Sequence, residues 1–173
     1  MRKKILATVI GLTALTAVAA AAILLMKPGK EAANARPPAD HEMMAHWKQH
    51  RATLDQITEM LRSDPALNRL GLTWSDPDDP ARAHVPAERI ADYRDLMREA
   101  SIISVSRGHR SVQFLFHSSQ SPVGRFNKSF VRGEASPRAE IINGDLDSAA
   151  AERAKALLQR PIAEGWWLQR DGS

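Results

Sequence analysis

The side chains best suited to chemistry gather between positions 117 and 128. They are His117, Ser118, Ser119, Ser121 and Lys128. A serine acts as a nucleophile only when a base lies within hydrogen-bond reach and donors face the developing oxyanion. The segment contains neither Gly-x-Ser-x-Gly nor Ser-x-x-Lys, and its serines stand beside proline and glycine, which favours a loop at 118–124. A hydrolase acting through His117, Ser118 and Lys128 is therefore kept only as an alternative.

Metal-ligating residue types occur, but their spacing does not favour a metal site. His41 and His46 are five residues apart, which turns their side chains about 140° from each other on a helix. His46 and His50 are correctly spaced for one helix face, yet no third ligand is evident near them. The acidic residues of 75–80 alternate with prolines in a solvated loop pattern and lack the glycine and terminal glutamate of a calcium loop. We expect no metal and no cofactor.

Lys128 is the polar residue with the clearest potential for binding. In a strand it shares one face with Phe126 and Phe130. If that face is buried, the ammonium must find a partner or extend along its alkyl stem. A fixed cation in a partner groove is one interpretation, and an edge-strand lysine that discourages aggregation is the other.

Two adjacent tryptophans near the C-terminus complete the candidate residues. In a strand, Trp166 and Trp167 must point to opposite faces, one into the core and one toward an interface or membrane headgroups. Together with Lys128 and His117, they are the residues that we expect to contribute to binding.

The order of the predicted elements indicates how these residues are positioned. Apolar side chains at three- and four-residue spacing predict a helix over 41–61, with Asp40 as N-cap, and a second helix beginning at Pro86. Period-two alternation then predicts strands over 101–106, 111–117, 125–132 and 139–143. Residues 66–74 are expected to form a turn or a short helical piece, 148–159 a helix, and 161–170 a hairpin or an edge strand that turns at Gly165. The fold class is α+β, with two helices packed on a small antiparallel sheet.

The N-terminus carries a strong targeting signal. Residues 5–26 form an uncharged, mostly apolar run that follows the basic tail of residues 1–4. As a helix this run would reach about 33 Å, enough to cross a hydrocarbon core of about 30 Å. We expect a transmembrane signal-anchor from Ile5 to Met26, with residues 1–4 in the cytoplasm. The alternative is a signal peptide cleaved after Ala19, which would release a soluble protein.

Charge and composition limit the classes of partner and the chemistry that we expect of the exported part. The chain has a formal net charge of +4, but from His41 to Ser173 there are eighteen Lys and Arg against eighteen Asp and Glu. Nucleic-acid binding therefore lacks electrostatic support. Residues 27–40 contain Pro37 and Pro38 and are predicted to be an extended linker. There is no cysteine, which excludes disulfides and thiolate chemistry.

Four short motifs resemble an uncharacterised family of small bacterial proteins over about residues 54–170. The motifs are "M-L-x-x-D-P-x-L" at 60–67, "P-x-E-R-x-x-x-Y-R-x-L" at 86–96, "G-x-x-K-G-Y" at 124–130 and "R-P-I-E-G-x-W-Y-L" at 160–168. The third motif departs from the family, because Ser129 and Phe130 stand for Gly-Tyr and the spacing is one residue longer. The resemblance supports the fold class and implies no activity.

The sequence as a whole predicts a single-pass protein of the bacterial inner membrane with a periplasmic α+β domain over 41–173. Its expected role is that of a non-catalytic binding module, since no convincing catalytic set is present. The membrane, through the N-terminal helix, and an envelope protein are the expected partners. The envelope hydrolase and an inhibitor of an envelope enzyme remain alternatives.

Overall fold

The amphipathic segment after residue 39 forms the longest helix, α2 (Asp40–Ser63). The computed structural model describes residues 37–121 and 124–172. The predicted helix over 41–61 is confirmed, and its apolar stripe is buried. The N-cap is Ala39 rather than the expected Asp40, which is the first helical residue and has its carboxylate turned inward. The buried stripe includes Met43, Trp47, Leu54, Ile57 and Leu61.

The second helix, α3 (Ala87–Glu99), begins directly after Pro86, as the sequence predicts. Its buried residues are Ile90, Tyr93 and Met97, which recur at three- and four-residue spacing. A short helix, α4 (Leu146–Glu152), comes later in the chain, with the Asp145 carboxylate accepting a hydrogen bond from the Ser148 backbone N–H at 2.8 Å.

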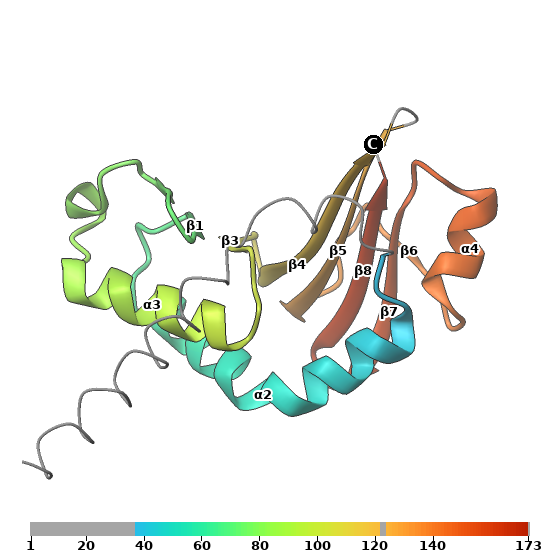
Figure 1. The fold of residues 1–173 in the computed structure, drawn as a ribbon, viewed down its shortest axis with the longest axis horizontal. Helices are drawn as coiled ribbons and strands as arrows, with labels where there is room; N and C mark the ends of the chain where they lie inside the picture. The colour runs from blue at the N-terminus through green and yellow to red at the C-terminus, as the bar shows by residue number, and fades with distance from the viewer. Residues whose placement is uncertain (1–36, 122–123, 173) are drawn as a thin grey trace, which may run out of the picture. The chain divides into compact units, whose positions relative to one another are not determined.

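Eight strands form one mixed sheet within the described residues, in the spatial order β2-β1-β3-β4-β5-β8-β7-β6. All neighbouring pairs are antiparallel except β6 and β7, which are parallel and joined through α4. Figure 1 shows α2 and α3 on one side of this curved sheet. The strands are β1 (Arg69–Gly71), β2 (Ser75–Asp76), β3 (Ser104–Arg107), β4 (Ser111–Ser121), β5 (Gly124–Gly133), β6 (Glu140–Ile141), β7 (Leu157–Ala163) and β8 (Trp166–Gly172).

The α+β class is confirmed, but the predicted small antiparallel sheet is wrong, because the sheet has eight strands among the described residues and is mixed, with β6 parallel to β7. Several finer predictions are also wrong. Part of the segment 66–74, expected to be a turn or helical piece, forms β1 because its Leu70 is buried opposite Val105 of β3. The loop expected at 75–80 contains β2 and leads into the 3-10 helix η2 (Pro80–Ala83). The loop expected at 118–124 is mostly the extended end of the β4–β5 hairpin.

The helix predicted over 148–159 ends early, which is a further correction. It stops at Glu152, and Leu157 already belongs to β7. Leu158 is fully buried and pairs with β8 on one side and β6 on the other, so sheet pairing overrides its helix propensity. The predicted hairpin at the C-terminus is confirmed, and Gly165 at its turn has a φ of 64°.

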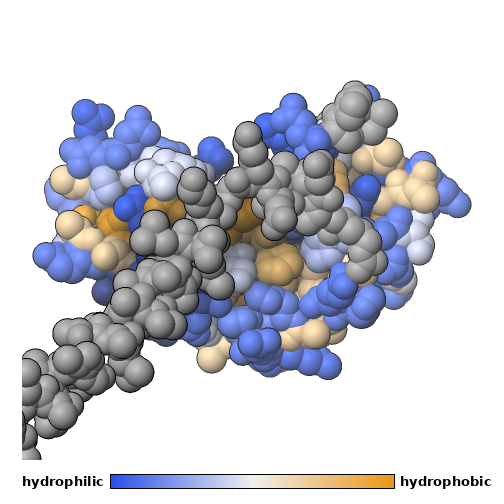
Figure 2. All heavy atoms as spheres, viewed as in Figure 1, coloured by the Kyte–Doolittle hydropathy of each residue, from blue (hydrophilic) through white to orange (hydrophobic). Residues whose placement is uncertain are grey.

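The sheet has two faces of different character. The helix face carries the apolar core, including Phe114, Phe130, Trp166 and Leu168, against α2 and α3. The opposite face, which we call the open face, carries Ser106, Gln113, Ser129, Val131, Gln159, Gln169 and Asp171 by strand alternation. In the space-filling view, hydrophilic side chains cover much of the visible surface, and hydrophobic ones show in smaller groups between them (Figure 2).

The N-terminal predictions fall on residues that lie outside the described part. The predicted span from Ile5 to Met26 and the predicted linker as far as residue 36 are both among the residues that the structure does not describe. Across residues 37–121 and 124–172, no helix combines the length and apolar character needed to span a bilayer.

Candidate functional site

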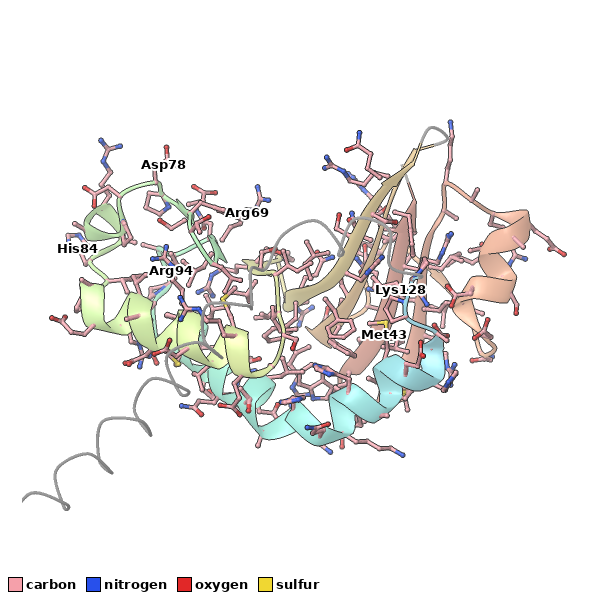
Figure 3. All side chains as sticks on the ribbon, viewed as in Figure 1. Met43, Arg69, Asp78, His84, Arg94 and Lys128 are labelled. Atoms are coloured by element: carbon pink, nitrogen blue, oxygen red, sulfur yellow. The ribbon has the colours of Figure 1, made fainter. Side chains whose placement is uncertain are left out.

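Lys128 lies at the centre of a buried ion-pair network, and its side chain is fully buried. Its ammonium donates to the Asp147 carboxylate at 2.6 Å, to the Pro38 carbonyl at 2.7 Å and to the Asp40 carboxylate at 3.2 Å. Figure 3 shows Lys128 directed from the sheet toward the first turn of α2, near Met43. All three hydrogens of the ammonium therefore have an acceptor.

The Asp40 carboxylate, 2% exposed, completes its own set of partners. It accepts a hydrogen bond from the Leu146 backbone N–H at 2.8 Å and forms an ion pair with Arg160 at 3.2 Å. Leu146 begins α4 and Arg160 lies in β7. The network thus joins the start of α2, the central strand β5, and the α4–β7 unit.

Neither predicted role of Lys128 agrees with this geometry. A groove cation must be accessible to a ligand, but Lys128 has no exposed surface. An edge-strand lysine needs an edge strand, but β5 lies between β4 and β8. Buried ion pairs are favoured only when their remaining hydrogen bonds are satisfied, which is the case here. Lys128 is a structural residue in this arrangement.

The same network also explains a cluster of carboxylates. Oxygens of Asp40, Asp145 and Asp147 lie within 4.8 Å of one another, close enough to hold a cation. The Lys128 ammonium already contacts two of the three. It supplies the positive charge that such a cluster requires, so the cluster carries no argument for a metal.

His117 pairs with Lys128 across the β4–β5 ladder and lies on the same face. Its ring packs 5.6 Å from the ring of Phe126, and its Nε2 is buried without a hydrogen-bond partner among the described residues. Burial lowers the pKa of His117, and the charge of Lys128 lowers it further. The imidazole is therefore held neutral near pH 7.

The alternative of a hydrolase is not supported by the strand geometry. Ser118 comes directly after His117 in β4, and adjacent strand residues point to opposite faces. A serine on the open face cannot pass its proton to an imidazole on the helix face. Lys128, the third member of that set, already binds three oxygens.

Trp166 and Trp167 point to opposite faces, as expected from a strand. Trp166 is fully buried, stacked 5.9 Å from Phe114 and edge-on to Trp47 at 6.0 Å. Trp167 is half-buried on the open face, and its Nε1 donates to the Gly133 carbonyl at 3.0 Å. Trp166 is therefore a core residue, and Trp167 is the one of the two that a ligand can reach.

The two histidines of α2 are packed in the domain rather than arranged around a metal. The rings of His46 and His50 lie 4.5 Å apart, and His46 also packs against Phe116 at 4.5 Å. Nε2 of His46 is hydrogen-bonded to the Ala100 carbonyl at 2.8 Å. Because that carbonyl only accepts, Nε2 carries the proton and is not available as a metal ligand. Burial lowers the pKa of His46 as well.

A hollow of about 830 Å³ on the open face is a candidate binding site in the described part of the chain. It lies between the β3–β4 turn at 107–110 and the segment 134–138, which leaves β5 and crosses the open face toward β6. That segment is held in place because the Ser136 backbone N–H donates to the Gln159 side chain at 2.8 Å. Its floor consists mainly of Gln113, Val131, Gln159, Gln169 and Asp171.

The chemistry of this open-face hollow is that of hydrogen bonding. The amide of Gln159 donates to that of Gln169 at 2.8 Å, and Gln113 donates to Ser129 at 3.0 Å. At the rim, Arg110 pairs with Glu134 at 2.9 Å, and Arg138 is exposed. Amides and hydroxyls recognise peptide groups and other polar ligands. His109, Glu134 and Asp171 also line the hollow, so its lining contains titratable groups as well.

A second, partly buried polar cluster went unrecognised in the sequence. The Asp64 carboxylate accepts from the Tyr93 hydroxyl at 2.7 Å and from Arg89 at 3.1 Å. Burial, together with the bond to Asp64, raises the pKa of Tyr93. These three residues belong to the first and second motifs that carry the family resemblance. The Asp-Pro pattern of the first motif and the Arg-x-x-x-Tyr pattern of the second could have indicated in the sequence that these two motifs lie close together in the fold.

The comparisons with known proteins give no further guidance. No family model, no curated protein and no solved structure matches this chain.

Proposed function

We propose that this protein is a membrane-anchored envelope protein whose α+β domain binds a partner and performs no chemistry. The observation that carries the proposal is the open-face hollow of about 830 Å³, whose lining combines glutamine amides and serine hydroxyls with arginines, His109, Glu134 and Asp171. Binding sites are typically concave, with a few polar groups that fix the orientation of the ligand. In the alternative of a hydrolase, the nucleophile Ser118 and the base His117 point to opposite faces of β4.

The membrane attachment rests on the sequence. Residues 5–26 are long and apolar enough to cross a bilayer, and the basic tail before them favours a cytoplasmic N-terminus. Fractionation of the cell envelope with intact-mass measurement of the purified protein tests this part. The uncleaved mass in the membrane fraction supports an anchor, and a mass lacking the N-terminal segment overturns it in favour of a cleaved signal.

The binding role is tested by affinity capture from a detergent-solubilised envelope extract with the full-length protein. A variant of the hollow, Arg138→Glu, changes an exposed rim residue. A matched control, Arg62→Glu, changes an exposed arginine at the end of α2. We expect one specific partner with the wild type and the control, and less of it with Arg138→Glu. Absence of a specific partner at every salt concentration contradicts the proposal.

An inhibitor of an envelope enzyme is one form that this binding role can take. The identity of the captured partner separates it from other binding roles. A screen of the full-length protein against ester, amide and glycoside substrates tests the alternative of a hydrolase, for which we expect no turnover.

A further inference from the structure

One edge of the sheet is open along the second half of β4. On that side, β3 pairs only with residues Val112 to Leu115 of β4. The chain before β3 then turns away toward α3, because the Ile102 N–H bonds back to the Met97 carbonyl. No strand in the described part of the chain pairs with this side of β4 from His117 onward. Figure 1 shows the far half of β4 extending beyond β3.

The hydrogen-bond pattern identifies which backbone groups face outward on this free edge. Phe130, Lys128 and Phe126 are every second residue of β5. Beyond the bulge, Lys128 pairs with His117 of β4, and Phe126 pairs with Ser119. The Leu115 carbonyl bonds to Ile103 on the β3 side, so its partner Ser129 directs its own groups away from β4, toward β8. The backbone N–H and C=O groups of successive strand residues point to opposite neighbouring strands. Lys128 and Phe126 therefore direct these groups toward β4.

His117 and Ser119 therefore exchange hydrogen bonds with β5, whereas Ser118 and Gln120 direct their N–H and C=O groups outward. The side chains of both outward residues are exposed. These four backbone groups form a template for one more strand.

The free edge lacks most of the usual protection against strand addition. Residues 117–120 contain no proline and no lysine. A bulge between Leu115 and His117 interrupts the register with β5, but it lies before the free stretch and leaves residues 117–120 accessible. Ile103, 43% exposed at the start of this edge, offers an apolar contact to an incoming strand.

The charge around the free edge indicates which charge a partner strand should carry. Between Glu99 and Glu134 the chain has five Lys and Arg residues and no acid. Lys128, Arg132 and Arg110 have carboxylate partners. Arg125, exposed and opposite Gln120 at the end of the free edge, forms no ion pair within the described part of the chain. A strand that adds here meets an uncompensated positive charge.

We propose that the free edge of β4 binds an extended, acidic segment of a partner protein by strand addition. The inference rests on the proposed binding function and names the surface and the chemistry of the partner. A second copy of this chain is disfavoured as occupant, because pairing two β4 edges would bring two copies of the same basic segment together.

The test uses a defined probe and the full-length, ¹⁵N-labelled protein in detergent. The probe is a capped octapeptide of alternating glutamate and threonine. Two comparison peptides carry lysine in place of glutamate, or N-methyl groups on every second amide. We expect the acidic peptide to shift the amide resonances of Ser118 and Gln120 most strongly. The lysine and N-methylated peptides should bind about tenfold more weakly, as the loss of one or two hydrogen bonds or of the charge attraction requires.

Paired variants separate the backbone from the side chain. Ser118→Pro and Gln120→Pro each remove an outward N–H while leaving the ladder to β5 intact. Ser118→Ala and Gln120→Ala keep the N–H. We expect about tenfold weaker binding in the proline variants than in the alanine variants. Circular dichroism confirms that each variant folds, and the N-methylated peptide gives the same comparison on the wild-type protein if a proline variant does not.

Three outcomes overturn the inference. They are the absence of shifts at Ser118 and Gln120 with millimolar acidic peptide, equal binding of the acidic and lysine peptides, and self-association of the protein that the proline variants abolish. Partner capture that depends on Arg138 but is unaffected by Gln120→Pro would leave the proposed function standing and refute strand addition. Peptide binding at β4 without any envelope partner would refute the proposed function alone.

Discussion

The ammonium of Lys128 and the carboxylate of Asp40 lie 3.2 Å apart in the protein interior, although 88 residues separate them in the chain. Lys128 belongs to the middle of the sheet, and Asp40 begins the helix that covers it. The same ammonium binds the carbonyl of Pro38, which precedes α2. The point where the chain enters the domain is thus bound to the central strand.

Replacing Lys128 with methionine should destabilise the domain strongly. The change removes the donor of hydrogen bonds to Asp40, to Asp147 and to the Pro38 carbonyl from a position that is fully buried. Breaking a buried pair on one side costs about 3–5 kcal/mol, and the remaining bonds from Arg160 and Leu146 to Asp40 place the expected loss at the lower end.

Urea denaturation measures this loss, with Arg98→Ala as the control. Arg98 pairs with Asp95 on the exposed surface of α3, so its removal should cost less than about 1 kcal/mol. Similar losses in the two variants would show that the Lys128 network is no more important than a surface pair.

The start of the domain should also decide whether a truncated protein folds. A chain that begins at His41 lacks both the Pro38 carbonyl and the Asp40 carboxylate, whereas a chain that begins at Arg36 keeps them. We expect the longer fragment to melt cooperatively and the shorter one to melt at a much lower temperature or to be unfolded. Thermal melts followed by circular dichroism compare them, and equal melting temperatures would refute the role of the network.

The helices could be predicted from the sequence because their signals are local. Met43, Trp47 and Leu54 repeat at helical spacing, and Pro86 marks the start of α3. The long strands could be predicted in part, since Phe114 and Phe130 alternate with polar residues. These features depend only on neighbours within a few residues.

The network and the hollow could not be predicted because they depend on distant pairing. Nothing near Lys128 in the chain indicates that Asp40 and Asp147 meet its ammonium. Leu158 has strong helix propensity and alanine-rich neighbours, yet it pairs in the sheet between β8 and β6. The hollow forms only after the chain crosses the open face and Ser136 reaches Gln159.

Stability should fall as the pH drops below about 6.5, because two histidines are buried in their neutral form. The folded-state pKa values of His46 and His117 are lowered by burial, and His50 and Lys128 respectively lower them further. The unfolded chain binds protons at the ordinary histidine pKa of about 6.5, before the folded chain does. The stabilisation is therefore complete above that pH and is lost progressively as the pH approaches the lower folded pKa values.

Free energies of unfolding at pH 7.5 and at pH 5.5 measure this effect. His117→Leu removes one of the two groups, and its Nε2 has no hydrogen bond in the described part to lose. The variant should show a smaller difference between the two pH values than the wild type. An unchanged difference would mean that His117 does not titrate in the expected way.

The two adjacent tryptophans provide the sharpest comparison of the sheet's faces. Trp166→Ala opens a cavity between Trp47 and Phe114 and should cost about 3–5 kcal/mol of unfolding free energy. Trp167→Ala removes a half-buried ring and one hydrogen bond to the Gly133 carbonyl, for which we expect about 1–2 kcal/mol.

If Trp167 also contributes to the binding surface, its variant should lose captured partner while remaining folded at the temperature of the assay. Urea denaturation of both variants, and then capture with the Trp167 variant, checks the assignment. Equal losses of stability would contradict the placement of the two rings on faces of different burial.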